Sequence, residues 1–125
     1  MNEQNFGPHL YIDATVNNSS NIDDLDYIFM FMNFLPEKIG MTKITQPYIF
    51  RYSGLNPDDC GITGMVIIAE SHISIHTFTK KNYIFLDIFS CKYFNYLEVV
   101  EIFKNFFNVK TINYKIVQRG IDFPR

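Results

Sequence analysis

The chain has 125 residues, a formal net charge of −2 and 47% hydrophobic residues, including 13 Phe and 8 Tyr. This length and composition fit one folded domain and exclude a disordered chain, and the charge gives no electrostatic reason to bind nucleic acid or an anionic membrane. The sequence contains neither the roughly 18 consecutive apolar residues of a membrane span nor a secretory leader. We therefore expect a single domain over residues 1–125, located in the cytoplasm, with Cys60 and Cys91 reduced.

The first half of the chain predicts a strand, a helix and a second strand. Residues 9–16 alternate as a strand does, and residues 22–35 carry apolar side chains at helical spacing. Pro36 is expected to kink or stop that helix. Residues 44–52 have the composition of a strand, although Pro47 indicates an edge strand or a later start.

The second half predicts a loop, three strands, a helix and a closing strand. In chain order these are residues 53–61, 65–69, 72–78, 83–89, 95–107 and 109–117. The order of elements predicts an α+β fold, a two-layer α/β sandwich with an antiparallel sheet and two main helices on one face.

Residues 69–91 concentrate the side chains that nucleophilic and proton-transfer chemistry uses. They include Ser71, Cys91 and two of the three histidines, His72 and His76. The residues around the histidines are β-branched and favour a strand, whose period of two places both imidazoles on one face. In a continuous strand Ser71 and His76 would lie about 16 Å apart, so spacing alone does not place them in one site.

Other interpretations of these residues stay open. The two histidines have the spacing of a helical zinc pair, but no third ligand stands out, and they also suit a solvated strand face. Cys91 could be an ordinary buried thiol. Ser71, His76 and Asp87 would make a hydrolase triad, although no Gly-x-Ser-x-Gly elbow surrounds the serine.

Four motifs in this chain form a recognisable set. The central one is Glu70-Ser71-His72-Ile73-Ser74-Ile75-His76-Thr77. The others are Gly7-Pro8-His9-Leu10-Tyr11-Ile12-Asp13, Gly61-Ile62-Thr63-Gly64 and Asp87-Ile88-Phe89-Ser90-Cys91. Together they resemble the prokaryotic S-adenosylmethionine decarboxylase proenzymes over nearly the whole chain. That family makes its own pyruvoyl cofactor from the serine of the Glu-Ser pair.

The resemblance implies self-cleavage between Glu70 and Ser71. The products would be a beta chain, residues 1–70, and an alpha chain, residues 71–125. Ser71 would become the pyruvoyl group, which forms a Schiff base with the substrate amine and acts as the electron sink for decarboxylation.

The resemblance also assigns roles to other residues. His76 would remove the α-proton of Ser71 during processing, and Thr63, where the family has Ser, would support the oxyanion. Cys91 would donate the proton in decarboxylation. A homodimer of processed protomers with sites at the interface is implied, with no metal and no PLP.

The chain departs from the family where substrate is bound. The family has Trp-Pro-Glu after His-Thr, and its Glu holds the ribose hydroxyls; here Phe78-Thr79-Lys80 puts a cation in that place. Asp58 and Asp59 are candidates to face a substrate cation, or solvated carboxylates of an ordinary turn. Phe50 and Phe78 are the candidate aromatic contacts.

The expected function is therefore a pyruvoyl-dependent decarboxylase of polyamine biosynthesis, acting on S-adenosylmethionine. The alternative is L-ornithine or L-arginine decarboxylation on the same scaffold. A protein of a different class, an unprocessed relative acting as a regulatory partner, stays open as well.

Overall fold

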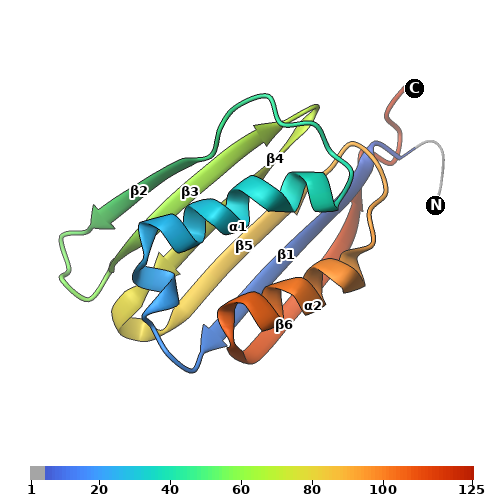
Figure 1. Cartoon of the computed structure of the whole chain (residues 1–125). Coiled ribbons are helices and arrows are strands. Elements are labelled where there is room, and N and C mark those ends of the chain that lie inside the picture. Colours follow the sequence, from blue (N-terminus) through green and yellow to red (C-terminus); the bar gives the residue numbers. More distant parts are fainter. Residues whose placement is uncertain (1–4) are drawn as a thin grey trace.

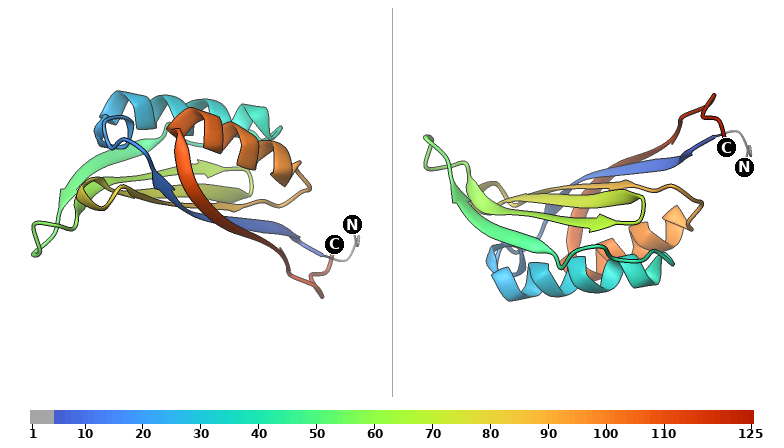
Figure 2. Two further views of the ribbon diagram at one scale, coloured as in Figure 1. Left: turned by 90° about the horizontal axis from the view of Figure 1, so that it is seen from below. Right: turned by 90° about the horizontal axis from the view of Figure 1, so that it is seen from above.

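The computed structural model describes residues 5–125. A six-stranded antiparallel sheet forms one layer, and two helices pack on one of its faces (Figures 1 and 2). The α+β two-layer sandwich predicted from the sequence is confirmed.

The strands follow the order β2-β3-β4-β5-β1-β6 across the sheet. Their bounds are β1 Gly7–Val16, β2 Tyr48–Ser53, β3 Cys60–Ile68, β4 Ser71–Phe78, β5 Tyr83–Phe89 and β6 Val109–Arg119. The helices are α1 Leu25–Lys38 and α2 Tyr96–Phe107, with short 3-10 turns η1 Asn21–Asp23 and η2 Thr79–Lys81.

Side-chain caps fix where the two helices begin. The Asp24 carboxylate accepts hydrogen bonds from backbone N–H groups of the first turn of α1, and the Asn95 side chain accepts one from the N–H of Glu98 in α2. The apolar stripes of both helices then pack against the inner face of the sheet. The largest fully buried side chains include Phe31, Phe103, Phe107, Leu10, Ile12 and Ile73. Burying each contributes roughly 1.5–3 kcal/mol.

Two predicted boundaries, the end of α1 and the start of β3, were wrong. Pro36 does not stop α1, which continues to Lys38, because the proline lies in the last turn and removes only one intrahelical bond. β2 begins at Tyr48, immediately after Pro47, and lies at the edge of the sheet, so both the edge position and the later start that the proline indicated are confirmed. β3 begins at Cys60 rather than at residue 65.

Glycine explains the early start of β3. An ideal Cβ built on Gly61 would lie 1.8 Å from the carbonyl oxygen of Thr77, so only glycine lets β3 approach the end of β4 this closely. The predicted loop was too long because glycine lowers strand propensity in a sequence pattern. Here pairing with β2 along residues 60–65, joined by β4 from Thr63 onward, keeps the segment extended.

No helix among residues 5–125 covers the outer face of the sheet, opposite α1 and α2 (Figure 2). The strand registers place a group of half-exposed or exposed apolar side chains on this face: Tyr11, Tyr48, Phe50, Tyr52, Met65, Ile67, Phe85 and Val117. An apolar surface of this kind on a sheet is typical of a contact with another protein surface.

The sheet has two ends that differ in what they carry. At the end that we call the Ser71 end, the β3–β4 turn lies beside the end of β5, the start of β1 and the end of β6 (Figure 1). The opposite end, which we call the Asp59 end, carries the β2–β3 loop and η2. Strand β4 connects the two.

Candidate active site

The Glu70–Ser71 peptide lies in a tight, accessible turn. Ile68 pairs with Ser71 across the β3–β4 hairpin, so Ala69 and Glu70 alone connect the two strands. Glu70 is exposed and Ser71 is half-buried. The N–H of Ala69 donates to the carbonyl of Thr42 at 2.9 Å, which holds the turn from the side. A break in this turn would leave both new ends attached to the sheet.

Cys91 contacts this turn through both its backbone and its thiol. It lies two residues after the end of β5. Its N–H donates to Ser71 Oγ at 3.2 Å. Its Sγ lies 3.6 Å from the carbonyl oxygen of Ala69 and 3.5 Å from the backbone nitrogen of Glu70. The structure therefore brings the predicted hydroxyl and thiol together. Cys60, the other free cysteine of the described residues, begins β3 at the Asp59 end.

The start of β1 holds the Cys91 segment in place. The N–H of Ser90 donates to the carbonyl of Pro8 at 3.0 Å, and Ser90 Oγ donates to the carbonyl of Lys92 at 2.6 Å. An ideal Cβ on Gly7 would lie 2.0 Å from the carbonyl oxygen of Ser90. Glycine at position 7 is thus required for this close approach of the two backbones.

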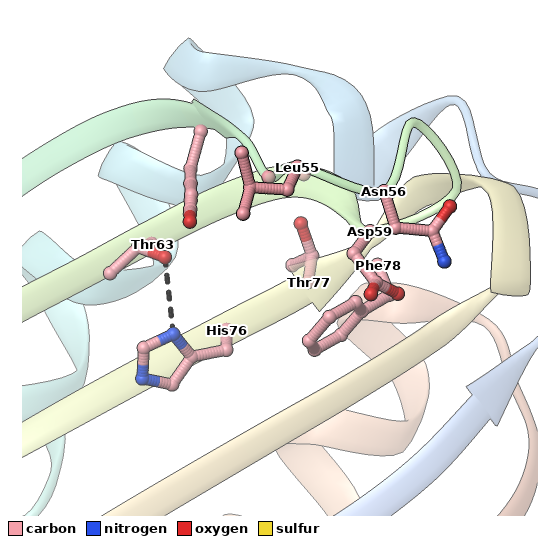
Figure 3. A pocket seen from close by; sticks show the side chains of 10 residues that line it. Leu55, Asn56, Asp59, Thr63, His76, Thr77 and Phe78 are labelled. Carbon is pink, nitrogen blue, oxygen red and sulfur yellow. Dashed lines mark hydrogen bonds between the residues drawn. The ribbon is translucent and has the colours of Figure 1, made fainter.

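His76 and Thr63 form a separate pair on the outer face. They are cross-strand partners on β4 and β3, and Thr63 Oγ1 lies 3.1 Å from His76 Nδ1 (Figure 3). Phe50 and Phe85 flank them in the same row of the sheet. The His76 side chain is exposed. An exposed imidazole with one nitrogen held by a hydroxyl can accept or donate a proton at the other.

Ser71 and His76 do not meet within one chain. β4 is continuous from Ser71 to Phe78, so the two residues are separated by about 16 Å of extended strand. Ser71 also has the strand parity of the buried Ile73 and Ile75, whereas His76 belongs to the outer face. Thr63 is at the same distance along β3. The residues assigned to processing thus fall into two groups.

A cavity of about 550 Å³ opens beside His76 at the Asp59 end (Figure 3). Its lining includes Tyr52, Leu55, Asn56, Asp59, His76 and Phe78. Phe78, a predicted substrate contact, is therefore placed on a cavity. Phe50, the other one, is 62% exposed on the outer face and is not among the residues that line this cavity.

The two predicted acidic contacts are paired with lysines of their own chain. Lys81 Nζ lies 2.6 Å from Asp59 Oδ1, and Lys80 Nζ lies 3.9 Å from Asp58 Oδ1. The hydrogen bond and the charge of Asp59 raise the pKa of Lys81 above its usual value, so this ammonium stays charged at neutral pH. Each of the two predicted acidic contacts therefore has an ion-pair partner in its own chain, and a role for either in binding a substrate cation stays a prediction.

Sequence reasoning missed a polar cluster at the Ser71 end. His9 Nε2 donates to Asp87 Oδ1 at 2.9 Å. Arg119 Nη1 lies 3.4 Å from His9 Nδ1, and its guanidinium stacks over the Phe89 ring at 4.2 Å from the centroid. His9 and Asp87 each belong to a motif quoted above, but only strand pairing between β1 and β5 shows that they touch.

Comparison with known proteins shows the family of this chain. The family model described as S-adenosylmethionine decarboxylase matches residues 8–120. The chain belongs to this family. A Clostridium botulinum S-adenosylmethionine decarboxylase proenzyme is 33% identical over 115 residues, 91% of this chain and 94% of that protein.

Two further comparisons extend the family match. A Thermococcus kodakarensis S-adenosylmethionine decarboxylase proenzyme is 34% identical over 86 residues, which are 68% of this chain but only 57% of that protein. The crystal structure of the adenosylmethionine decarboxylase from Aquifex aeolicus superposes with a TM-score of 0.74 over 94% of this chain and 93% of that one. At 24% identity this likeness shows the shared fold.

Residues 5–125 meet neither the requirements for a metal site nor those for a membrane-spanning helix. No group of three or more His, Cys, Asp or Glu side chains there is arranged to hold a metal ion. None of the helices in this part of the chain has the length and apolarity needed to cross a membrane.

Proposed function

We propose that the chain is an S-adenosylmethionine decarboxylase of polyamine biosynthesis that cleaves itself between Glu70 and Ser71. The observation that carries the proposal is the 3.2 Å hydrogen bond from the N–H of Cys91 to Ser71 Oγ, made in an exposed turn. The family of decarboxylases to which the chain belongs, and its relatives named as proenzymes, support it.

Self-cleavage follows from the chemistry of the Glu70–Ser71 unit. Ser71 Oγ attacks the carbonyl carbon of Glu70, the Glu70–Ser71 amide bond breaks, and an ester replaces it while the hydroxyl proton passes to the freed nitrogen. Removal of the Ser71 α-proton then breaks the Cβ–Oγ bond, which leaves Glu70 with a carboxylate. Water replaces nitrogen at the dehydroalanine that remains, ammonia is released, and position 71 becomes a pyruvoyl group.

The residues around position 71 fit such a group. β4 pairing would keep residue 71 in place after cleavage, and before cleavage the N–H of Cys91 donates to Ser71 Oγ, the atom that attacks Glu70. When formed, the pyruvoyl group supplies the electron sink for loss of CO₂. The Cys91 thiol lies beside the same turn, where it is placed to act as the proton donor in decarboxylation.

A second copy of the chain completes the site in this proposal. Within one chain, Thr63 and His76 stand apart from Ser71 and Cys91, so neither group can act alone. The uncovered outer face, with its exposed aromatic side chains, offers a surface for a second copy. Packed face to face about a twofold axis, each copy would bring its Thr63–His76 pair to the Ser71 end of the other.

The same arrangement supplies a place for substrate. The cavity beside His76, at about 550 Å³, has the size of a small-molecule site and would adjoin the partner copy's Ser71 end. We propose S-adenosylmethionine as its ligand. Ornithine and arginine are the alternative substrates, but the ion pairs of Asp58 and Asp59 leave no free pair of acids to favour either of them.

The intact mass of the purified protein tests the proposal. Wild type should give two fragments, residues 1–70 and residues 71–125, the second with a blocked N-terminus, whereas Ser71→Ala should give one chain. CO₂ release from S-adenosylmethionine, ornithine and arginine then identifies the substrate. A folded wild-type chain that stays uncleaved would contradict the proposal and favour a non-catalytic relative.

A further inference from the structure

The side chain of Arg125 binds three backbone carbonyls at the Ser71 end. Its Nε donates to the carbonyl of Asn5 at 3.0 Å. Its Nη2 donates to the carbonyls of Phe6 and Cys91, the latter at 2.9 Å. The C-terminal segment after β6 lies at this end of the sheet (Figure 1). One guanidinium therefore joins the segment before β1 to the segment after β5.

The segment that carries Arg125 is folded onto the sheet. Gly120 turns it with a φ of +63°, and an ideal Cβ there would lie 2.5 Å from Phe6 Cβ. The Phe6 and Phe123 rings pack edge to face with centroids 4.9 Å apart. The Arg125 guanidinium lies 5.6 Å and 5.9 Å from those two centroids. Aromatic packing and hydrogen bonds together give this arginine a defined position.

Cys91 contacts both Arg125 and the residues proposed to react in self-cleavage. Its carbonyl accepts from Arg125, its N–H donates to Ser71 Oγ, and its thiol contacts the Ala69–Glu70 turn. Cys91 lies outside any strand, so ladder hydrogen bonds do not fix its backbone. We propose that Arg125 is a positioning residue for Cys91, and through it for self-cleavage at Ser71. This inference rests on the proposed function.

Arginine suits this role better than lysine. Its planar guanidinium presents donors in fixed directions and can reach carbonyls on two segments at once. A lysine ammonium could donate to one or two of these carbonyls without the same geometry. After cleavage the contact would also bridge the fragments, because Arg125 belongs to residues 71–125 and Asn5 and Phe6 to residues 1–70.

The test compares Arg125→Ala and Arg125→Lys with Asp122→Ala. Asp122 lies in the same exposed segment and makes no side-chain hydrogen bond or ion pair with residues 5–125, so its removal is a matched control. The first readout is the rate of self-cleavage. We expect Arg125→Ala to slow it about tenfold, as loss of a charge-assisted hydrogen bond next to reacting groups does. Arg125→Lys should recover part of the rate.

The second readout does not require cleavage. In a Cys60→Ala, Ser71→Ala background Cys91 is the one remaining thiol of an uncleaved chain. We expect Arg125→Ala to speed its alkylation several-fold, with little change at Asp122→Ala. The melting temperature of each variant separates positioning from general unfolding.

The outcomes separate the two proposals. If wild type does not cleave but Arg125→Ala still changes Cys91 alkylation, the proposed function fails and the positioning role stands. If Arg125→Ala cleaves at the wild-type rate and leaves alkylation unchanged, the positioning role is wrong. Equal loss of cleavage in Arg125→Ala and Asp122→Ala, in step with lost stability, would also overturn it.

Discussion

Different kinds of contact hold the functional residues in place at the two ends of strand β4. At the Ser71 end, the backbone of the Cys91 segment makes the placing contacts: the N–H of Cys91 donates to Ser71 Oγ at 3.2 Å, the N–H of Ser90 donates to the carbonyl of Pro8, and the carbonyl of Cys91 accepts from Arg125. At the Asp59 end, His76 is exposed and its surroundings are held by side-chain pairs such as Lys81 with Asp59.

This difference indicates that the two ends of β4 have different roles. Backbone contacts between distant segments change little when side chains are replaced, so they suit chemistry that must not vary. Exposed ion pairs are weak and screened by salt, and one substitution alters them. We infer that the Ser71 end fixes the reaction and that the Asp59 end is where substrate preference can change.

Coexpression of two inactive variants is the strongest test of whether the two ends of β4 act together across two copies of the chain. Ser71→Ala lacks the cleavable residue, and His76→Ala lacks the proposed base, so each alone should give no fragments. Coexpressed, they should restore cleavage, because the intact His76 of one copy serves the Ser71 of the other. Mass spectrometry checks this directly, since every fragment 71–125 must carry the His76→Ala change.

One control and one contradicting outcome complete this test. Coexpressing Ser71→Ala with Cys91→Ala should also give fragments, all carrying the Cys91 change, if Cys91 acts only after processing. Absence of fragments from the Ser71→Ala and His76→Ala mixture, in dimers shown to contain both chains, would mean that His76 does not act across the interface. The outer face would then need a different explanation.

The two cysteines offer the next largest contrast. Cys91 touches the Ser71 turn, whereas Cys60 begins β3 at the Asp59 end. Cys91→Ala should still cleave but turn over substrate roughly a hundredfold more slowly, the usual contribution of a placed proton donor. Cys60→Ala, the matched control, should keep turnover near wild type. The measurement is CO₂ release from each cleaved variant, and undiminished turnover in Cys91→Ala would remove its assigned role.

Much of the fold was readable from local pattern. β4 and β5 were predicted to within one residue because β-branched and aromatic residues alternate there, and α2 because its apolar stripe is regular. The start of β3 was missed because Gly61 is explained by a contact with β4, which no local window contains. The continuation of α1 past Pro36 was missed because a proline in a final turn costs only one bond.

Some contacts of the candidate site could likewise be predicted from the sequence, and others could not. The Ser71 and Cys91 contact follows a motif, so it could be anticipated, and the separation of Ser71 from His76 followed from strand rise. The pairing of Asp59 with Lys81 joins residues on two different loops. Arg125 and Cys91 are 34 residues apart, with α2 and β6 between them. Such contacts arise from tertiary structure and leave no periodic signal.

Lys81→Gln alters only the Asp59 end of β4, and we expect it to have a smaller effect than the variants above. It leaves the Asp59 charge uncompensated beside the cavity. We expect KM for a cationic substrate to fall roughly twofold to fivefold, the range of exposed charge pairs, with self-cleavage unchanged. Because Asp59 raises the pKa of Lys81, the pair persists as pH rises through the neutral range and is lost only above the usual lysine pKa. The wild-type to variant ratio of KM should therefore be constant between about pH 7 and 9.

The direction of the KM change decides what this end recognises. Lys110→Gln, which removes an exposed cation from β6, is the control for net charge and should leave KM unaltered. A lower KM in Lys81→Gln alone means that Asp59 can attract substrate once its partner is removed, so the lysine limits affinity for cations. A higher KM means that the Lys81 ammonium itself contacts an anionic group of the substrate. No change at low salt, where such interactions are strongest, would place substrate charge away from this cavity and end the assignment of specificity to the Asp59 end.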